Sequence, residues 1–294
     1  WDGFARDAQH SALTATGGPA TQDLPCIYWQ TAVDLAPQFN ANGSLLTHYG
    51  SPVITRRNTV VVPVKTGAAG GFRVDARSGH DGTLKWTLAS DYVLPAHVWI
   101  PGFNPVLAAP ATIGALPRLV MPAAGGRLIV RTDPDADTGT TDTLVFYGTA
   151  AYAANAAAFD ATVFISTPLT ADSRGNVYFG FQVTGANPAN LVGGFARVAP
   201  NGTASVVSAA SASGDVALVK PQTNSAPALS PDESRLYVVI NNVVAAGTRA
   251  RGSLLMLDAT TLAPMAQRTL LDPGTGTAAW LSDNSTASPT VGPD

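Results

Sequence analysis

Residues 224–239 read NSAPALSPDESRLYVV, and residues 165–180 read ISTPLTADSRGNVYFG. Both consist of a small residue, Pro and an apolar residue, followed by a polar turn and a run of residues typical of a strand. This Pro-centred step occurs five times, at Pro52, Pro105, Pro168, Pro227 and Pro289. The spacings are 53, 63, 59 and 62 residues by subtraction. Such a recurring unit predicts a repeat architecture.

Each period contains about four short β-like runs separated by Gly, Pro, Asn or Asp. They span residues 52–56, 59–64, 70–76 and 82–88, then 105–109, 118–123, 126–132 and 143–148, then 167–171, 176–183, 193–199 and 203–209, then 226–230, 235–242, 252–258 and 263–270. A four-stranded antiparallel unit at this spacing predicts an all-β fold, the β-propeller. The predicted single domain covers residues 1–294, with blades that start near residues 51, 104, 167, 226 and 288.

Burial explains why such units would form a ring. A single four-stranded sheet cannot cover both of its faces, so blades pack face to face around an axis and leave only short edges exposed. Small residues and Pro suit an innermost strand that is crowded near this axis. Two stacked β-sandwich domains are the alternative β fold, but they would not explain five similar Pro-centred starts.

The composition is that of a globular chain with a sizeable core, since 46% of the residues are hydrophobic and only 13% are charged. A formal net charge of -3 provides no electrostatic footprint for nucleic acid. The sequence contains no run of 18 apolar residues, so it predicts no transmembrane helix. The first residue is Trp1 rather than Met, which suggests a removed leader and an extracytoplasmic location. Cys26 is the only cysteine, which excludes an internal disulfide.

Several segments resemble a known repeat family. WDGFARDAQHSALTA at the start, CIYWQTAVD, GSPVI and DARSGHDGTLKW look like the opening of a pyrroloquinoline-quinone-like (PQQ-like) β-propeller. ALSPDESRLYVV and LLMLDATTL are similar to the YVTN-type repeats of bacterial surface propellers. These resemblances cover most of the chain and imply the fold. The family includes both quinoprotein dehydrogenases and non-catalytic relatives.

The resemblance also implies how the ring closes. In such propellers the N-terminal strand commonly completes the last blade, and residues 26–33 (CIYWQTAV) are the candidate here. Four complete units and the start of a fifth do not make a ring of six to eight blades. We therefore expect the domain to be incomplete after Asp294; a compact ring of about five blades is the alternative.

Quinoprotein catalysis implies a bound quinone, a calcium ion and a carboxylate base. The alcohol-oxidising members also carry a pair of adjacent cysteines, which this sequence lacks. The blade-docking signature matches clearly only once, at Gly82, Leu84 and Trp86. Sugar-oxidising members manage without the cysteine pair, so an oxidoreductase stays as an alternative.

The segment RTDPDADTGTTDT contains the closest match to a metal site. Asp133, Asp135, Asp137 and Asp142 resemble the alternating carboxylates of a calcium loop. However, Thr138 stands at the sixth position, where such loops need Gly. The alternative is a polar hairpin between the third and fourth strands of the second blade. The sequence therefore predicts no cofactor other than a possible Ca²⁺.

A ligand-binding rim is predicted where outer strands connect to the next inner strand. The candidate residues are His48, Tyr49, His97, Trp99, Asn104, Asn224 and Asn284. Aromatic and amide side chains at a channel mouth suit a sugar or a peptide. The alternative is that they plug the channel or satisfy loop backbone. His80 is expected to be solvated in a turn, and His10 to be structural.

Taken together, these features favour a non-catalytic extracytoplasmic propeller that acts as a protein-interaction or scaffold module. A quinoprotein oxidoreductase and a glycan-binding surface propeller are the alternatives. The predicted partner is a protein or a glycan bound at the rim.

Overall fold

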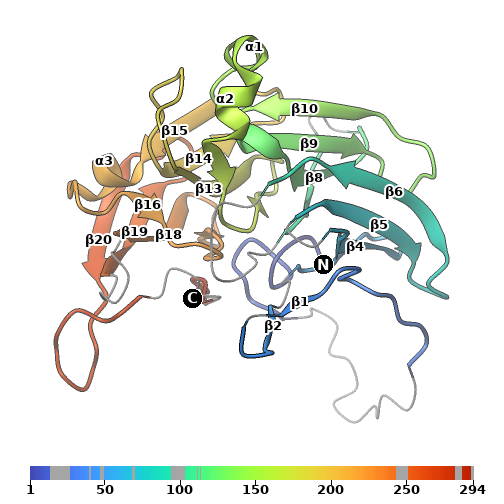
Figure 1. Cartoon of the computed structure of the whole chain (residues 1–294), viewed down its shortest axis with the longest axis horizontal. Coiled ribbons are helices and arrows are strands. Elements are labelled where there is room, and N and C mark those ends of the chain that lie inside the picture. Colours follow the sequence, from blue (N-terminus) through green and yellow to red (C-terminus); the bar gives the residue numbers. More distant parts are fainter. Residues whose placement is uncertain are drawn as a thin grey trace.

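The computed structural model describes residues 1–13, 27–39, 41–46, 50–67, 70–93, 103–110, 112, 114–242, 251–281 and 287–292. The chain forms a β-propeller in which four antiparallel sheets, the blades, fan out in an arc (Figure 1). The N-terminus lies near the centre of this arc, where the innermost strands converge (Figure 1). The predicted fold class and the four complete blades are confirmed.

The strands follow the predicted runs closely. Blade 1 contains β3 (Val53–Ile54), β4 (Thr59–Lys65), β5 (Phe72–Ser78) and β6 (Leu84–Ser90). Blade 2 contains β7 (Val106–Ala108), β8 (Arg118–Pro122), β9 (Arg127–Thr132) and β10 (Thr141–Val145). Blade 3 contains β11 (Val163–Ile165), β12 (Thr170–Ala171), β13 (Val177–Val183), β14 (Gly194–Val198) and β15 (Ala204–Ser208). Blade 4 contains β16 (Lys220–Pro221), β17 (Ala228–Leu229), β18 (Arg235–Asn241), β19 (Gly252–Asp258) and β20 (Pro264–Thr269).

Several short elements lie outside the blade strands. The hairpin of β1 (Gln38–Phe39) and β2 (Leu45–Leu46) precedes blade 1. A 3-10 turn, η1 (Ala124–Gly126), joins β8 to β9. The helices α1 (Thr149–Ala154) and α2 (Ala156–Asp160) connect blade 2 to blade 3, and α3 (Ala209–Ser213) follows blade 3. The sequence did not predict these pieces, which are too short to show an apolar period of 3.6 residues.

Polar side chains close the turn between the first two strands of a blade. Thr55 Oγ1 accepts the backbone N–H of Thr59 at 3.0 Å, and Asp172 Oδ1 accepts that of Asn176 at 2.8 Å. Ser230 Oγ accepts the N–H of Arg235 at 3.0 Å in blade 4. Such side chain to backbone bonds favour turns over helix or strand. We call this side of the propeller the turn face.

Alternation along the strands builds the core between blades. In β13, Phe179 and Phe181 belong to the apolar cluster shared by blades 1 to 3, whereas Tyr178 belongs to the cluster shared by blades 3 and 4. Successive strand residues point to opposite faces of a sheet, so blade 3 is covered on both sides. All three side chains are at most 1% exposed. Packing of neighbouring blades therefore supplies the burial that one sheet lacks.

The innermost strands of blades 3 and 4 are each divided into two pieces. β11 and β12 both pair with β13, and β16 and β17 both pair with β18. The predicted runs contained only the second piece in each case. The Pro-centred step separates the pieces, because Pro lacks a backbone N–H and cannot donate in the ladder.

The structure differs from the prediction that residues 26–33 form the outer strand of the last blade. Residues 27–33 form no strand and lie along blade 1, where Trp29 Nε1 donates to Gly79 O at 3.2 Å. Asp34 then pairs in parallel with Lys65 at the end of β4. The physical reason is a buried ion pair, since the fully buried Lys65 ammonium lies 3.2 Å from Asp34 Oδ1.

Candidate functional site

Most residues of the predicted rim lie outside the described part of the chain. These are His48, Tyr49, His97, Trp99 and Asn284. The other two are buried: Asn104 is 4% exposed and Asn224 is 7% exposed. Asn104 Oδ1 accepts the N–H of Ser51 at 2.7 Å, and the N–H of Asn224 donates to Ser166 O at 2.8 Å. Asn104 therefore satisfies loop backbone, as the alternative interpretation predicted.

The four aspartates of the predicted calcium loop are not gathered around one point. Asp133 and Asp135 lie at the start of the β9–β10 connection, Asp137 is exposed and 3.6 Å from Lys85 Nζ, and Asp142 lies within β10. No group of three or more His, Cys, Asp or Glu side chains within the described residues could hold a metal ion. The segment joins the third and fourth strands of blade 2, so the hairpin alternative describes its position.

The cation of this loop is an arginine. Arg131, 6% exposed, donates to the carbonyl oxygens of Ala136 at 3.0 Å and Asp137 at 3.4 Å. Its guanidinium lies 4.0 Å from the ring centroid of Trp86, in a cation–π contact. Burial lowers the pKa of Arg131, and the charges of Asp133 and Asp137 oppose that shift. The carbonyl oxygens that a calcium ion would require are thus directed to a side chain.

A cavity with a volume of about 640 Å³ opens on the turn face, close to the axis. Turns of all four blades contribute to its walls, and the N-terminal residues contribute to its base. The lining residues are Asp2, Asp7, Ala8, Gln9, Thr55, Arg56, Arg57, Leu107, Ala108, Ala109, Pro110, Leu116, Pro117, Asp133, Pro134, Asp135, Ala171, Asp172, Ser173 and Glu233. This axial cavity is therefore a property of the assembled propeller and not of any single blade.

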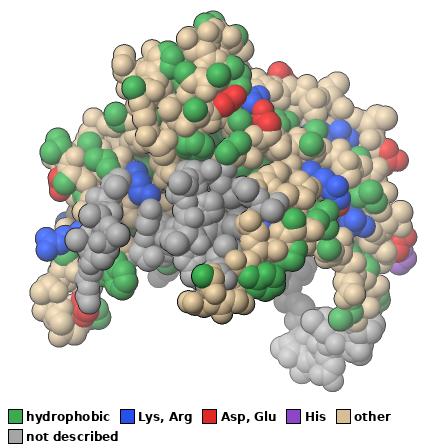
Figure 2. All heavy atoms as spheres, viewed as in Figure 1, with side chains coloured by type: hydrophobic (Ala, Val, Ile, Leu, Met, Phe, Trp, Pro, Cys, Tyr) green, Lys and Arg blue, Asp and Glu red, His purple; other side chains and the backbone are tan. Residues whose placement is uncertain are grey.

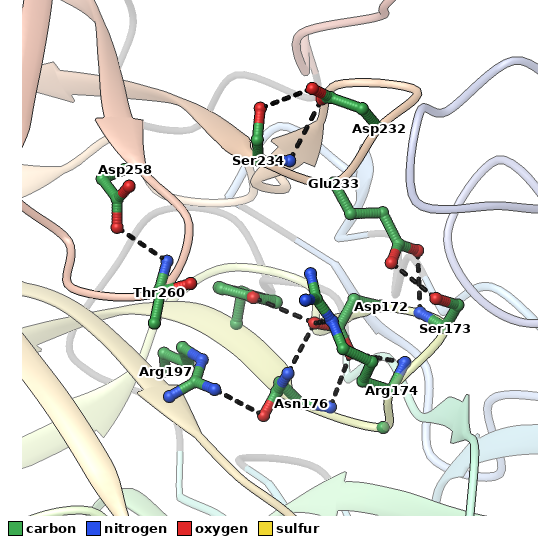
Figure 3. A network of polar contacts seen from close by, with 12 residues as sticks. Asp172, Ser173, Arg174, Asn176, Arg197, Asp232, Glu233, Ser234, Asp258 and Thr260 are labelled. Carbon is green, nitrogen blue, oxygen red and sulfur yellow. Dashed lines mark hydrogen bonds and ion pairs between the residues drawn. The ribbon is translucent and has the colours of Figure 1, made fainter.

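Hydrogen bonds between blades fix the walls of the axial cavity. Between blades 1 and 2, Thr55 Oγ1 donates to Asp135 Oδ1. Between blades 2 and 3, Arg118 donates to Gly175 O at 2.8 Å. Glu233 in the turn of blade 4 accepts both the N–H and the hydroxyl of Ser173 in blade 3, at 2.7 and 2.6 Å (Figure 3).

Asp172 is the centre of the polar network in Figure 3. This carboxylate is 3% exposed and accepts the N–H groups of Arg174 and Asn176, the Asn176 side-chain amide at 2.6 Å and the Tyr178 hydroxyl at 3.1 Å. Burial, together with the nearby charge of Asp172, raises the pKa of Tyr178, so this hydroxyl keeps its proton and remains a donor. Arg197 in turn donates to Asn176 Oδ1 at 2.8 Å. The network holds the blade 3 turn in place at the cavity wall.

The lining of the axial cavity is acidic and apolar. Six of the lining residues are acidic, namely Asp2, Asp7, Asp133, Asp135, Asp172 and Glu233, and two are exposed arginines, Arg56 and Arg57. The apolar part comes mainly from residues 107–110 and 116–117 of blade 2. On the described surface seen in Figure 2, Lys and Arg side chains are scattered and form no continuous basic band.

The quinone that the family resemblance implies does not fit this cavity. Pyrroloquinoline quinone carries carboxylate groups, and a site for it needs an excess of cationic donors. The axial cavity has the opposite balance, with six acidic and two basic residues. The described residues also contain no group of three carboxylates for an accompanying calcium ion.

The residues of the axial cavity were not among those predicted, apart from Asp133 and Asp135. A local signal for several of them was nevertheless present in the sequence. Each Pro-centred step in blades 1, 3 and 4 is followed by a short charged turn, at residues 55–58, 172–175 and 230–234. Because the repeat places these turns at one end of every blade, their side chains surround the axis.

Comparison with solved structures finds matches that cover most of this chain. The quinohemoprotein alcohol dehydrogenase from Comamonas testosteroni matches 82% of this chain and 37% of its own length, at 14% identity and a TM-score of 0.46. The Dos1 propeller matches 80% of this chain and 51% of its own length, at 11% identity and a TM-score of 0.36. A putative 6-phosphogluconolactonase from Bacteroides uniformis matches 81% of this chain and 67% of its own length, at 14% identity and a TM-score of 0.39. At these identities the likeness concerns the fold and says nothing of ligand or activity.

The chain thus spans about a third of the first of these structures and half of the second. A scan against protein-family models finds no match, and a search of curated proteins finds no relative. No helix within the described residues is long and apolar enough to cross a membrane.

Proposed function

We propose that this chain is a non-catalytic propeller that binds a segment of a partner protein in the axial cavity. The observation that carries this proposal is the cavity itself, about 640 Å³ in volume and formed by turns from all four blades. This volume lies within the range of ordinary ligand sites. The hydrogen bonds between blades hold the walls in place before a ligand arrives, which reduces the ordering cost of binding.

The lining favours a segment that carries both positive charge and an apolar side chain. Asp135 uses Oδ1 for the Thr55 hydroxyl, and within the described residues its Oδ2 has no hydrogen bond. Asp2 is exposed, so its carboxylate is open to a ligand. Leu107 and Leu116 supply an apolar wall for an aliphatic or aromatic side chain. Opposite charges across such an interface steer association and fix the register of the ligand.

Charge reversal inside and outside the cavity tests this proposal. The probe is a labelled peptide of alternating Lys and Leu, with a Glu and Leu peptide of the same length as the reference. We expect the Lys peptide alone to bind, and Asp135→Lys to weaken it about fivefold or more, since an exposed charge contact contributes up to about 1 kcal/mol. Asp142→Lys is the matched control, because Asp142 lies in the adjacent strand β10 and does not line the cavity.

Two outcomes would contradict the proposal. Equal weakening by Asp135→Lys and Asp142→Lys would mean that the peptide senses only the overall charge of the surface. Unchanged binding in Asp135→Lys would place the peptide elsewhere. The scaffold role and the extracytoplasmic location remain part of this proposal, as the family resemblance implies, and fractionation of cells that express the native protein tests the location.

A further inference from the structure

The five Pro-centred steps of the sequence meet the N-terminal segment at the axis. In four of them the residue two positions after Pro donates its backbone N–H to a carbonyl oxygen of residues 1–9. The bonds run from Ile54 to Trp1 at 2.8 Å, from Leu107 to Asp2 at 2.6 Å, from Leu229 to Ala8 at 2.7 Å and from Val291 to Gln9 at 2.9 Å. In the remaining repeat, the hydroxyl of Thr170 lies 3.5 Å from His10 Nε2.

The repeat itself explains this regularity. The innermost strand of a blade is an edge strand, so alternate N–H groups point away from its sheet and towards the axis. Pro has no N–H, and the equivalent residue two positions later is the donor in each of these four repeats. We call the amides of Ile54, Leu107, Leu229 and Val291 the axial track.

The axial track recognises main chain more than side chains. Within residues 1–13 only Gly3 and His10 are buried, and the other side chains are exposed or half-buried. The space at Gly3 is tight, because a Cβ there would lie 3.1 Å from Val106 Cγ2. His10 Nδ1 lies 2.7 Å from Pro289 O, and the Phe4 ring packs on the His10 ring in a T-shaped contact at 5.2 Å.

We propose that the axial track is a peptide-binding site that residues 1–10 fill within the chain and that a segment of another polypeptide with the same turn-rich conformation fills in exchange. The ligand class is a peptide that can form the turns seen at residues 2–6 and 7–10, with Gly at the position of Gly3 and a hydrogen-bonding ring at the position of His10. The affinity comes from single main-chain hydrogen bonds, one from each of four repeats, rather than from pairing along one strand edge.

This inference deepens the proposed function, since Asp2 and residues 7–9 belong both to the segment and to the lining of the axial cavity. A partner peptide that replaced the segment would therefore change that cavity. The two proposals nevertheless fail independently. The track is formed by backbone amides that Asp135→Lys leaves in place, whereas the cavity is tested with the segment still bound.

Peptide exchange onto a nicked protein tests the site. A protease sequence is inserted between Leu13 and Thr14, the purified full chain is cut there, and a synthetic peptide of residues 1–13 with a fluorophore at its C-terminus is added. We expect saturable uptake at one peptide per protein. A peptide with Gly3→Val should compete about tenfold less well, since overpacking costs about 1–3 kcal/mol and 1.4 kcal/mol is tenfold. A peptide with Leu13→Ala is the matched control, because Leu13 is 62% exposed.

The proposal is overturned if the nicked protein stays folded and takes up no labelled peptide, or if the Gly3→Val peptide competes as well as the control. Should the nicked protein unfold, hydrogen exchange on the intact chain decides. We expect the amides of Ile54 and Leu107 to exchange at least about tenfold faster than those of Val61 and Val74 in the sheet of blade 1, because the segment opens without the blades. Equal protection of the two sets would show a segment that never leaves the axis.

Discussion

Replacing Asp172 by Ala should strongly destabilise the propeller, although this residue belongs to a turn. Asp172 is 3% exposed and accepts hydrogen bonds from two backbone N–H groups, the Asn176 amide and the Tyr178 hydroxyl. Asn176 and Tyr178 are themselves 5% and 1% exposed, so water cannot readily replace the lost carboxylate. The cost of the substitution therefore arises from donors that are left buried without an acceptor.

The magnitude follows from those two buried donors. A buried polar group without a partner costs about 1–3 kcal/mol, so two of them predict a loss of roughly 4 kcal/mol in the free energy of unfolding. Asp172→Asn should cost about half as much. Its amide oxygen can still accept the backbone N–H groups, but its NH₂ would face the two side-chain donors.

Urea unfolding followed by circular dichroism and by tryptophan fluorescence measures this loss, provided that the two transitions coincide. Asp232→Ala is the matched control, because Asp232 lies in the equivalent turn of blade 4 but is exposed. We expect only a small loss there. A loss for Asp172→Ala below about 1 kcal/mol, or equal to that of the control, would refute the assignment of Asp172 as the centre of the turn network.

Three further predictions concern other parts of the chain. Burial lowers the pKa of His10 below 6.5, so as the pH drops the unfolded chain binds this proton before the folded chain does. The free energy of unfolding should therefore fall as the pH drops below about 6.5. Urea midpoints measured against pH should show a flatter fall in His10→Asn but not in His80→Asn. Arg131→Met should lower the free energy of unfolding in urea by about 2–3 kcal/mol, because it removes charge-assisted hydrogen bonds and a cation–π contact. Replacing the exposed Arg57 by Met should change this free energy little. Added calcium should not alter the melting temperature of the native chain. If the rim binds glycans, Trp99→Ala should weaken sugar binding roughly tenfold on a glycan array, and unchanged binding would remove that alternative.

The blades could be predicted because their signals are local. The Pro-centred step, the polar turn and the alternating strand all lie within about 16 residues, as in residues 165–180. The first pieces of the divided innermost strands were missed for an equally local reason. β11 follows α2 with only two residues between, and β16 contains Pro221, so neither shows an isolated period-two run bounded by turn residues.

The candidate site was harder to predict because its residues come from different repeats. Asp135 meets Thr55 across 80 residues, and Glu233 meets Ser173 across 60. A charged turn is an ordinary solvated feature when seen alone, and only the ring brings such turns to one cavity. Two of the four predicted aspartates of blade 2, Asp133 and Asp135, line the cavity, and their loop is organised around Arg131, which precedes them in β9.

The N-terminal segment shows why main-chain recognition is marked by the repeat and not by the type of the donor residue. Leu229 donates to Ala8 O through its backbone N–H, a group that every residue except Pro possesses. The position of that donor is set by Pro227 two residues earlier, so the repeat that predicts the fold also places the donors of the axial track. The turns, in contrast, differ between blades, with RRN at residues 56–58, SRG at 173–175 and DES at 232–234. If both proposals hold, the repeated edges bind the main chain of the ligand, and the varied turns add to the choice of ligand.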